Sequence, residues 1–336
     1  MAAPHLTTPT AWRSADLTDP TEWTIRLDPA AIDELVRVTA PWADAPIHDV
    51  PVFDPTDVPL PRLALAIADL RRTLTHGHGF RLVTGLPIAD LTDAHAAAAF
   101  VAIGAHLGRP RSQNAAGDLL GHVRDTGAAS TDPTVRIYQT SERQTFHTDS
   151  ADVVGLLCLQ DGLEGGDSLL VSAAAIHNEM LDRAPDLAAA LFEPIATDRR
   201  GEVPDDEDPF FTIPVLSWHA EHLTVMYQRQ YIESAQRFPD APRLDERMLA
   251  ALDLFDEIAN DPDVHLTMRL APGDMQFVHN HSMLHDRTAF VDRPDAPRHL
   301  LRLWLSVPGD RALPPVFASR FGSTTIGDRG GIVVSS

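Results

Sequence analysis

FHTDS at residues 146–150 constrains the fold and chemistry of this chain more than any other segment. It contains His147 and Asp149, and His285 and Arg298 follow far downstream. Two imidazoles and one carboxylate, with coordination positions left over, form the facial triad typical of non-haem Fe(II) sites that use oxygen. An arginine shortly after the second histidine matches a carboxylate bidentately, which predicts an acidic co-substrate beside the metal. The pattern therefore predicts an oxygenase that consumes a 2-oxo acid.

Three of the 16 histidines begin a His-x-acid pair: His147, His177 and His219. Side chains two residues apart share one face of a strand but diverge on a helix. His147 follows the β-prone run 134–140 and precedes the apolar run 153–159, which favours a strand. His177 lies in a helical pattern and is expected on a helix surface. His219 lies between two strand-like runs and is expected in a polar hairpin connection. His147 is therefore the favoured metal ligand of the three.

The second histidine of the triad has three candidates in the run GDMQFVHNHSMLHDRTAF, residues 273–290. These are His279, His281 and His285. Strand periodicity places His279 and His281 on one face, so spacing alone leaves them as candidates. The alternative interpretation is that His279 and His281 are not ligands and lie at a polar strand end near the mouth of the site. Arg143 and Gln144, just before the first ligands, are candidates for setting specificity.

Composition limits the partners of the chain. It has 48 acidic and 27 basic residues among 336, a formal net charge of −21, which repels nucleic acid and anionic membranes. No stretch approaches a membrane span, and the N-terminus lacks a secretory signal pattern. The single cysteine, Cys158, lies in an apolar run and is expected as a buried hydrophobe. We therefore expect a soluble cytoplasmic protein with a small-molecule substrate, and a homo-oligomer is compatible with this composition.

The order of expected elements predicts an α+β fold with a double-stranded β-helix (jelly-roll) core. A flexible N-terminus (1–20) precedes a single domain (21–310), and a flexible tail (311–336) follows. Helices are expected at 28–39, 61–75, 92–107, 172–191 and 244–260. Strands are expected at 22–27, 79–86, 121–125, 134–140, 153–160, 168–171, 211–217, 222–228, 264–270, 274–279 and 298–307. The charged segment 198–209 is either a solvated loop or a lid over the substrate.

Five motifs in order carry a resemblance to a known family. They are FHTDS (146–150), GGDS (165–168), PGDMQF followed by Asn280-x4-His285, HDRTAF (285–290) and RHLLRLW (298–304). From His147 onward the chain resembles the taurine dioxygenase/clavaminate synthase-like (TauD/TfdA) family of Fe(II)- and 2-oxoglutarate-dependent oxygenases. The matching pieces span most of residues 80 to 307.

The resemblance implies a role for six residues. His147, Asp149 and His285 would ligate the iron. Ser168 stands where the family usually has a threonine that hydrogen-bonds the distal carboxylate of 2-oxoglutarate, and Arg298 would pair with the same carboxylate. Arg302 would lie near the substrate or support the 2-oxoglutarate site.

The spacing of Arg298 and Arg302 puts both guanidinium groups on one side of a strand. An ordinary surface strand with solvated charges is the alternative. The neighbours Leu300, Leu301 and Leu303 are too apolar for a wet strand, and a buried charge requires a partner. Arg302 therefore suggests a substrate with an acidic group, such as an amino acid or a sulfonate.

The implied cofactors are Fe(II), 2-oxoglutarate as co-substrate, and O2, with release of succinate and CO2. Because Asp149 is present, hydroxylation, desaturation or cyclisation is favoured over the halogenation of related enzymes that lack this carboxylate. The alternatives are a cupin-like metal-dependent hydrolase and a non-catalytic metal-binding jelly roll. A hydrolase would have no use for Ser168 and Arg298.

Overall fold

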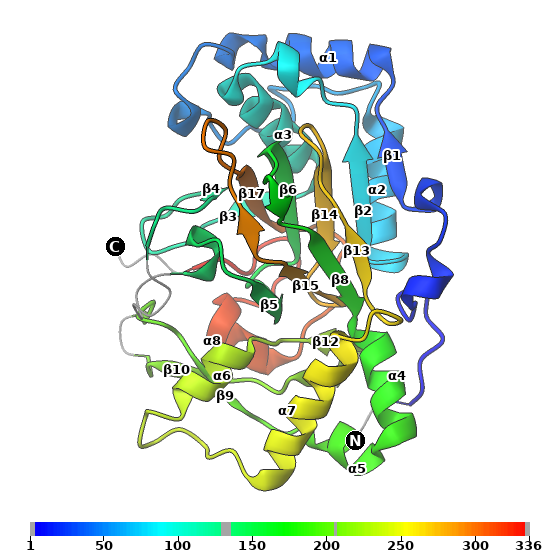
Figure 1. Cartoon of the computed structure of the whole chain (residues 1–336), viewed down its shortest axis with the longest axis vertical. Helices are drawn as coiled ribbons and strands as arrows, with labels where there is room; N and C mark the ends of the chain where they lie inside the picture. The colour runs from blue at the N-terminus through cyan, green and yellow to red at the C-terminus, as the bar shows by residue number, and fades with distance from the viewer. Residues whose placement is uncertain (1–3, 129–135, 205–206, 333–336) are drawn as a thin grey trace.

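The computed structural model describes residues 4–128, 136–204 and 207–332. These residues form an α+β fold in which two β-sheets stand face to face and helices cover their outer faces (Figure 1). Among them, no helix is long and apolar enough to cross a membrane.

The larger sheet has seven strands. Its order is β1 (Thr24–Arg26), β2 (Phe80–Thr84), β14 (Met275–His279), β6 (Val153–Gln160), β17 (His299–Ser306) and β3 (Arg109–Arg111), with β4 (Leu120–Val123) also paired to β17. Only β1 and β2 pair in parallel; the other pairs are antiparallel.

Three helices cover the outer face of this sheet: α1 (Pro29–Thr39), α2 (Ala64–His76) and α3 (Asp93–Leu107). Asp28 caps α1, whose first residue is a proline, and Thr92 caps α3. α3 is buried over nearly its whole length, because its alanines let it lie close to β6 and β17.

The smaller sheet has four antiparallel strands in the order β13 (Leu266–Met268), β8 (Ser168–Ser172), β15 (Met283–Arg287) and β5 (Gln144–His147). The helices α4 (Ala173–Arg183), α5 (Pro185–Ala190) and α7 (Glu246–Ala259) pack against its outer face. His285 pairs with His147 across β15 and β5, and Arg287 pairs with Ser168 across β15 and β8.

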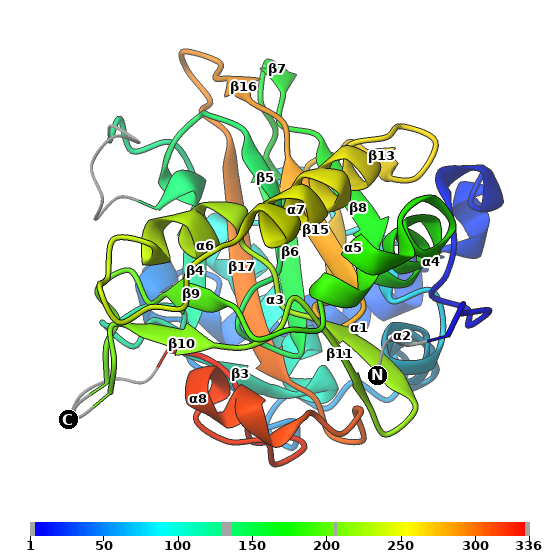
Figure 2. The same ribbon diagram turned by 90° about the horizontal axis from the view of Figure 1, so that it is seen from below.

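Short elements close one end of the two sheets (Figure 2). They are the hairpins β9 (Ala196–Asp198) with β10 (Phe210–Thr212) and β11 (Leu216–His219) with β12 (His222–Val225), and the helices α6 (Arg229–Ala235) and α8 (Ala318–Phe321). The two-residue strands β7 (Glu164–Gly165) and β16 (Phe290–Val291) pair with each other.

Most expected elements are present within a few residues of their predicted limits, but several details differ, and the strands β5 and β15 were not among the expected ranges. Residues 137–139 form a 3-10 helix where a strand was expected, and residues 134–135 of that run lie outside the described part. The expected strand 211–217 is two strands separated at Pro214. The expected helix 172–191 breaks at Ala184, because a residue before proline avoids the helical conformation. His177 lies on a helix but is buried beside Phe192, not exposed.

Both chain ends pack against the body of the protein in their described parts. Leu6, Trp12 and Leu17 are buried, as are Phe317 and Phe321. Cys158 is buried as predicted, and burial raises the pKa of its thiol to about 12.

The buried guanidinium of Arg329 anchors the C-terminal segment. Its Nε donates to Asp152 at 2.6 Å and its Nη2 to Asp310 at 2.9 Å, and all three side chains are fully buried. We expect Arg329→Met to lower the free energy of unfolding by about 3–5 kcal/mol, because two buried carboxylates lose their cation. Urea unfolding would measure this.

The matched control is Arg109→Met, which removes an exposed ion pair with Asp328. That pair should contribute less than about 1 kcal/mol. An equal decrease in the free energy of unfolding in the two variants would contradict the assigned role of Arg329.

Candidate metal centre

Side chains alternate between the two faces of a strand, and the predicted site residues occupy positions that face the space between the two sheets. On β5, Phe146 packs against the outer helices, so His147 faces inward. On β17, Leu301 and Leu303 pack against the outer helices, so Arg302 faces inward. On β8, Leu169 faces outward and Ser168 inward for the same reason.

His147, Asp149 and His285 converge at one point. Their ligand atoms all lie within 4.8 Å of one another. Asp149 Oδ1 is 3.9 Å from His147 Nε2, and Asp149 Oδ2 is 3.7 Å from His285 Nε2. Two ligands at right angles, each about 2.1 Å from one ion, lie about 3 Å apart. Shifts of less than about 1 Å would therefore let the three side chains share one metal ion.

A hydrogen bond to the backbone fixes the tautomer of His147 and leaves the lone pair on Nε2. Its Nδ1 lies 2.8 Å from the Thr145 carbonyl oxygen, which can only accept, so Nδ1 carries the proton. Nε2 then has a lone pair, and the Gln144 amide donates to it at 2.8 Å. The amide proton occupies the position from which a cation would approach.

Asp149 stays ionised although it is buried. Burial alone raises the pKa of its carboxyl, but Arg302, His285, His147 and a hydrogen bond from Trp304 lower it below its ordinary value. Trp304 Nε1 donates to Asp149 Oδ2 at 2.8 Å, and Arg302 Nη1 lies 3.6 Å from the same oxygen. The carboxylate is therefore oriented as well as charged.

Both histidines of the triad are neutral near pH 7, the form that binds metals. Burial lowers the pKa of His147, and burial together with His147 lowers that of His285 to about 3. The His285 Nδ1 is buried and has no hydrogen-bond partner among the described residues. Two neutral imidazoles and one carboxylate suit a divalent iron ion.

The low pKa of His285 predicts that acid destabilises the metal-free protein. Below pH 6.5 an unfolded histidine takes up a proton that His285, with a folded pKa of about 3, does not. Stability is therefore lost as pH falls from 6.5, and between pH 7 and pH 5 this residue should cost about 2 kcal/mol. Urea unfolding at the two pH values measures the loss.

In His285→Gln the loss between these pH values should be smaller by that amount. An identical loss in the variant and in the unaltered chain would show that His285 does not titrate as described.

A second group of polar residues lies next to the triad. Ser168, Arg298 and Arg302 line a small cavity together with His147 and His285. Burial lowers the pKa of Arg298, and its Nη1 is buried with no hydrogen-bond partner among the described residues. A buried, incompletely bonded guanidinium beside a hydroxyl is suited to a carboxylate that binds from the cavity.

The second glycine of the GGDS motif makes room for this arginine. Gly166 has a φ of +74°, and a Cβ atom there would lie 2.8 Å from Arg298 Nε. Any side chain at this position would both strain the backbone and displace the guanidinium. Ser168 Oγ donates to Gln276 Oε1 at 3.0 Å, so Gln276 positions the hydroxyl.

The other candidate histidines lie outside this site. His281 joins Asp152 and Asp310 in a second cluster with metal-ligand spacing, and His279 lies 3.0 Å from Asp310. The Arg329 guanidinium already binds both carboxylates, so a cation is in place there. His219 lies in the β11–β12 hairpin, as predicted.

Three further side chains near the triad can be compared with what the sequence suggested. Trp304 had no predicted role at the metal site, yet its indole N–H donates a hydrogen bond to Asp149. Gln144 lines the larger cavity described below, which agrees with its position just before the ligands in the sequence. Arg143 does not line it, because its guanidinium binds the buried Asp286.

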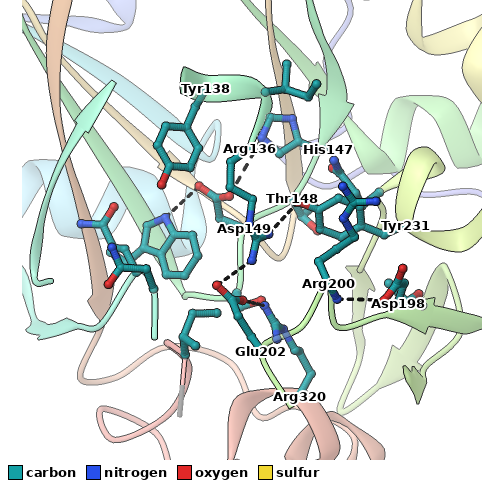
Figure 3. A pocket seen from close by; sticks show the side chains of 18 of the residues that line it. Arg136, Tyr138, His147, Thr148, Asp149, Asp198, Arg200, Glu202, Tyr231 and Arg320 are labelled. Carbon is teal, nitrogen blue, oxygen red and sulfur yellow. Dashed lines mark hydrogen bonds and ion pairs between the residues drawn. The ribbon is translucent and has the colours of Figure 1, made fainter. Parts of the chain in front are cut away.

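Two of the three candidate ligands, His147 and Asp149, also line a larger cavity of about 540 Å³ (Figure 3). Arg302 and Trp304 line it as well. Further lining residues come from the segment around residues 136–139, the segment 197–202, α6 and the C-terminal region: Arg136, Tyr138, Arg200, Glu202, Tyr231 and Arg320.

Two imidazoles and a carboxylate beside a buried guanidinium agree with the sequence-based expectation of an Fe(II)- and 2-oxoglutarate-dependent oxygenase. Similarity to known proteins shows that the protein is an enzyme of that class. The model of the taurine catabolism dioxygenase TauD, TfdA family matches residues 44–304. The chain belongs to this family.

Two relatives of known function are similar over most of the chain. FR-33289 synthase from Streptomyces rubellomurinus (strain ATCC 31215) is 34% identical over 311 residues, covering 90% of this chain and 91% of that protein. A uridine-5'-phosphate dioxygenase from Amycolatopsis sp is 31% identical over 238 residues, covering 67% of this chain and 84% of that protein.

Solved structures share the fold. Asparagine oxygenase in complex with Fe(II), 2S,3S-3-hydroxyasparagine and succinate superposes with a TM-score of 0.66 at 20% identity, over 84% of this chain and 93% of that chain. The non-haem iron oxygenase OrfP in complex with Fe and alpha-ketoglutaric acid has a TM-score of 0.61 at 16% identity, with the same coverage.

Proposed function

We propose that His147, Asp149 and His285 hold Fe(II) and that Arg298 and Ser168 hold the distal carboxylate of 2-oxoglutarate. The observation that carries this proposal is the convergence of the three ligand atoms beside a buried guanidinium that lacks a full set of acceptors. When bound, iron and 2-oxoglutarate supply the oxidation of the substrate, with release of succinate and CO2.

The side chains of the protein bind and orient these groups. Thr145 fixes the ring of His147 so that Nε2 faces the cavity, and Trp304 and Arg302 fix the carboxylate of Asp149. The bidentate geometry of Arg298 selects a planar carboxylate. The apolar lining of the small cavity, including Leu270 and Leu300, keeps water away from the co-substrate.

The two facing sheets support a jelly-roll core within a single domain of residues 21–310. The described part of segment 198–209 lines the larger cavity through Asp198, Arg200 and Glu202, which supports a lid role for it. Residues 205–206 lie outside the described part.

The substrate is a small molecule with an acidic or amino-acid-like group. The larger cavity opens beside the metal centre and is lined by several arginines. The names of similar proteins refer to uridine-5'-phosphate and to asparagine, both small polar molecules. Because Asp149 supplies a carboxylate where related halogenases have none, the proposed reaction is a hydroxylation, a desaturation or a cyclisation.

Succinate formation tests this proposal. With Fe(II), 2-oxoglutarate and O2, the full-length protein should form succinate, and a chelator should stop it. A panel of amino acids, sulfonates and phosphorylated small molecules should contain compounds that stimulate the reaction. A metal-dependent hydrolase would leave 2-oxoglutarate unchanged, and that result would refute the proposal.

A further inference from the structure

A β-bulge in β5 turns the side chain of Gln144 toward the metal centre. His147 pairs with His285 on the neighbouring strand β15 (Figure 2). Gln144 pairs with Arg287, so three steps along β5 match only two along β15. Side chains three residues apart point to opposite faces of a regular strand, but the extra residue of a bulge re-aims the side chains beside it. Gln144 therefore faces inward with His147, and it lines both cavities described above.

Contacts on both sides hold the bulge in place. Asp286 is the β15 residue between the two pairs, and its buried carboxylate accepts hydrogen bonds from Arg143 Nη2 at 2.6 Å and from Arg143 Nε at 3.0 Å. Arg287 donates to the backbone carbonyl of Thr140 at 3.0 Å. Because these contacts fix the backbone around it, Gln144 keeps its inward position when the contact of its own side chain is broken.

The amide of Gln144 occupies the nitrogen that a metal ion would use. The Thr145 carbonyl accepts from His147 Nδ1, so the lone pair of His147 is on Nε2. The Gln144 amide N–H donates to this lone pair, with 2.8 Å between the two nitrogen atoms. A divalent ion binds an imidazole nitrogen at about 2.1 Å along the same direction. The two cannot be in place together, so the amide must turn away when an ion binds.

This hydrogen bond stabilises only the metal-free state. His147 is buried and Gln144 is half-buried, so Nε2 loses its donor if the amide is removed from the metal-free protein. In the metal-bound state the ion itself interacts with the lone pair of Nε2. An interaction that exists only in the free state opposes binding by its own free energy.

We infer that Gln144 is a positioning residue of the metal centre: its amide holds the metal-free His147 ring and competes with the ion for Nε2. One hydrogen bond on each ring nitrogen fixes the orientation of the ring before the ion arrives. The same contact makes metal binding weaker and more easily reversed. The inference rests on the proposed function in one respect, which is that His147 is a metal ligand.

An anaerobic calorimetric titration of the full-length, metal-free protein with Fe(II) tests this inference. Gln144→Met keeps an unbranched side chain of similar length and removes the amide donor. Fe(II) should bind Gln144→Met about three- to tenfold more tightly than it binds the unaltered protein, which is the effect of one hydrogen bond of ordinary net strength. A residue that merely supported a metal ligand would give the opposite sign, because its loss weakens metal binding.

Gln228→Met is the matched control for this titration. Gln228 lies beside His147 through a backbone bridge and lines the larger cavity, but its side-chain oxygen has no hydrogen-bond partner among the described residues. Its variant should bind Fe(II) with unchanged affinity. If Gln144→Met does not fold, Gln144→Leu, which also lacks a donor, gives the same test.

Urea unfolding provides a second measurement that does not depend on activity. Without metal, the equilibrium constant for unfolding of Gln144→Met should be about three- to tenfold larger than that of the unaltered protein. In excess Fe(II) the two proteins should be equally stable, because the tighter binding offsets the lost hydrogen bond.

The failure of this inference and that of the proposed function give different results. Equal or weaker Fe(II) binding by Gln144→Met, or the same gain in Gln228→Met, would overturn the role of Gln144 and leave the proposed ligands in place. No Fe(II) binding by the unaltered protein would refute the proposed ligands and the inference with them.

Discussion

Asp149→Ala is expected to lower Fe(II)-dependent succinate formation by at least about 100-fold. Loss of groups that merely support a metal ligand costs about 10- to 100-fold, and Asp149 is placed as a ligand itself. The substitution also removes the only charge in the triad, so Fe(II) affinity should fall in parallel. Initial rates of succinate release and a calorimetric Fe(II) titration measure the two effects.

His219→Ala is the matched control for this experiment. His219 also begins a His-x-acid pair, but it lies in the β11–β12 hairpin and lines neither cavity described here. Its variant should retain full activity and Fe(II) affinity. If Asp149→Ala turned over normally, or if both variants lost activity equally, the ligand assignment would be wrong.

Arg298→Gln is expected to raise the 2-oxoglutarate concentration needed for half-maximal rate by tens- to thousands-fold. Loss of one partner of a buried charge pair costs about 2–5 kcal/mol in binding. The chemistry at the metal does not involve the guanidinium, so kcat at saturating 2-oxoglutarate should change much less than KM. Steady-state kinetics over a wide range of 2-oxoglutarate concentrations would separate the two constants.

Arg269→Gln provides the comparison, because Arg269 is partly exposed and pairs with Asp161 outside both cavities. Its 2-oxoglutarate dependence should be unchanged. An unchanged KM for 2-oxoglutarate in Arg298→Gln would show that Arg298 does not bind the co-substrate. A fall in kcat with normal KM would place it in a different role.

The parts of the site that depend on local pattern could be predicted from the sequence. Alternation along β17 is visible in RHLLRLW, so the inward direction of Arg302 follows from the leucines that flank it. The caps at Asp28 and Thr92 were predictable because they act within four residues. The motif order indicated the family, which the match over residues 44–304 confirms.

The parts that depend on distant partners could not be predicted. The spacing of His279 and His281 looked suitable for metal binding, and only the fold shows that Arg329, about 50 residues later, occupies the adjacent carboxylates. The hydrogen bond from Trp304 to Asp149 spans 155 residues. The C-terminal segment has the composition of a loose tail, yet it contributes Arg320 to the cavity.

An anaerobic crystal structure of the full-length protein with Fe(II) and 2-oxoglutarate tests the central assignment most directly. We expect one iron within about 2.0–2.2 Å of His147 Nε2, a carboxylate oxygen of Asp149 and His285 Nε2. The distal carboxylate of 2-oxoglutarate should lie against Arg298 and Ser168. Iron bound instead among Asp152, His281 and Asp310, or 2-oxoglutarate bound away from Arg298, would contradict it.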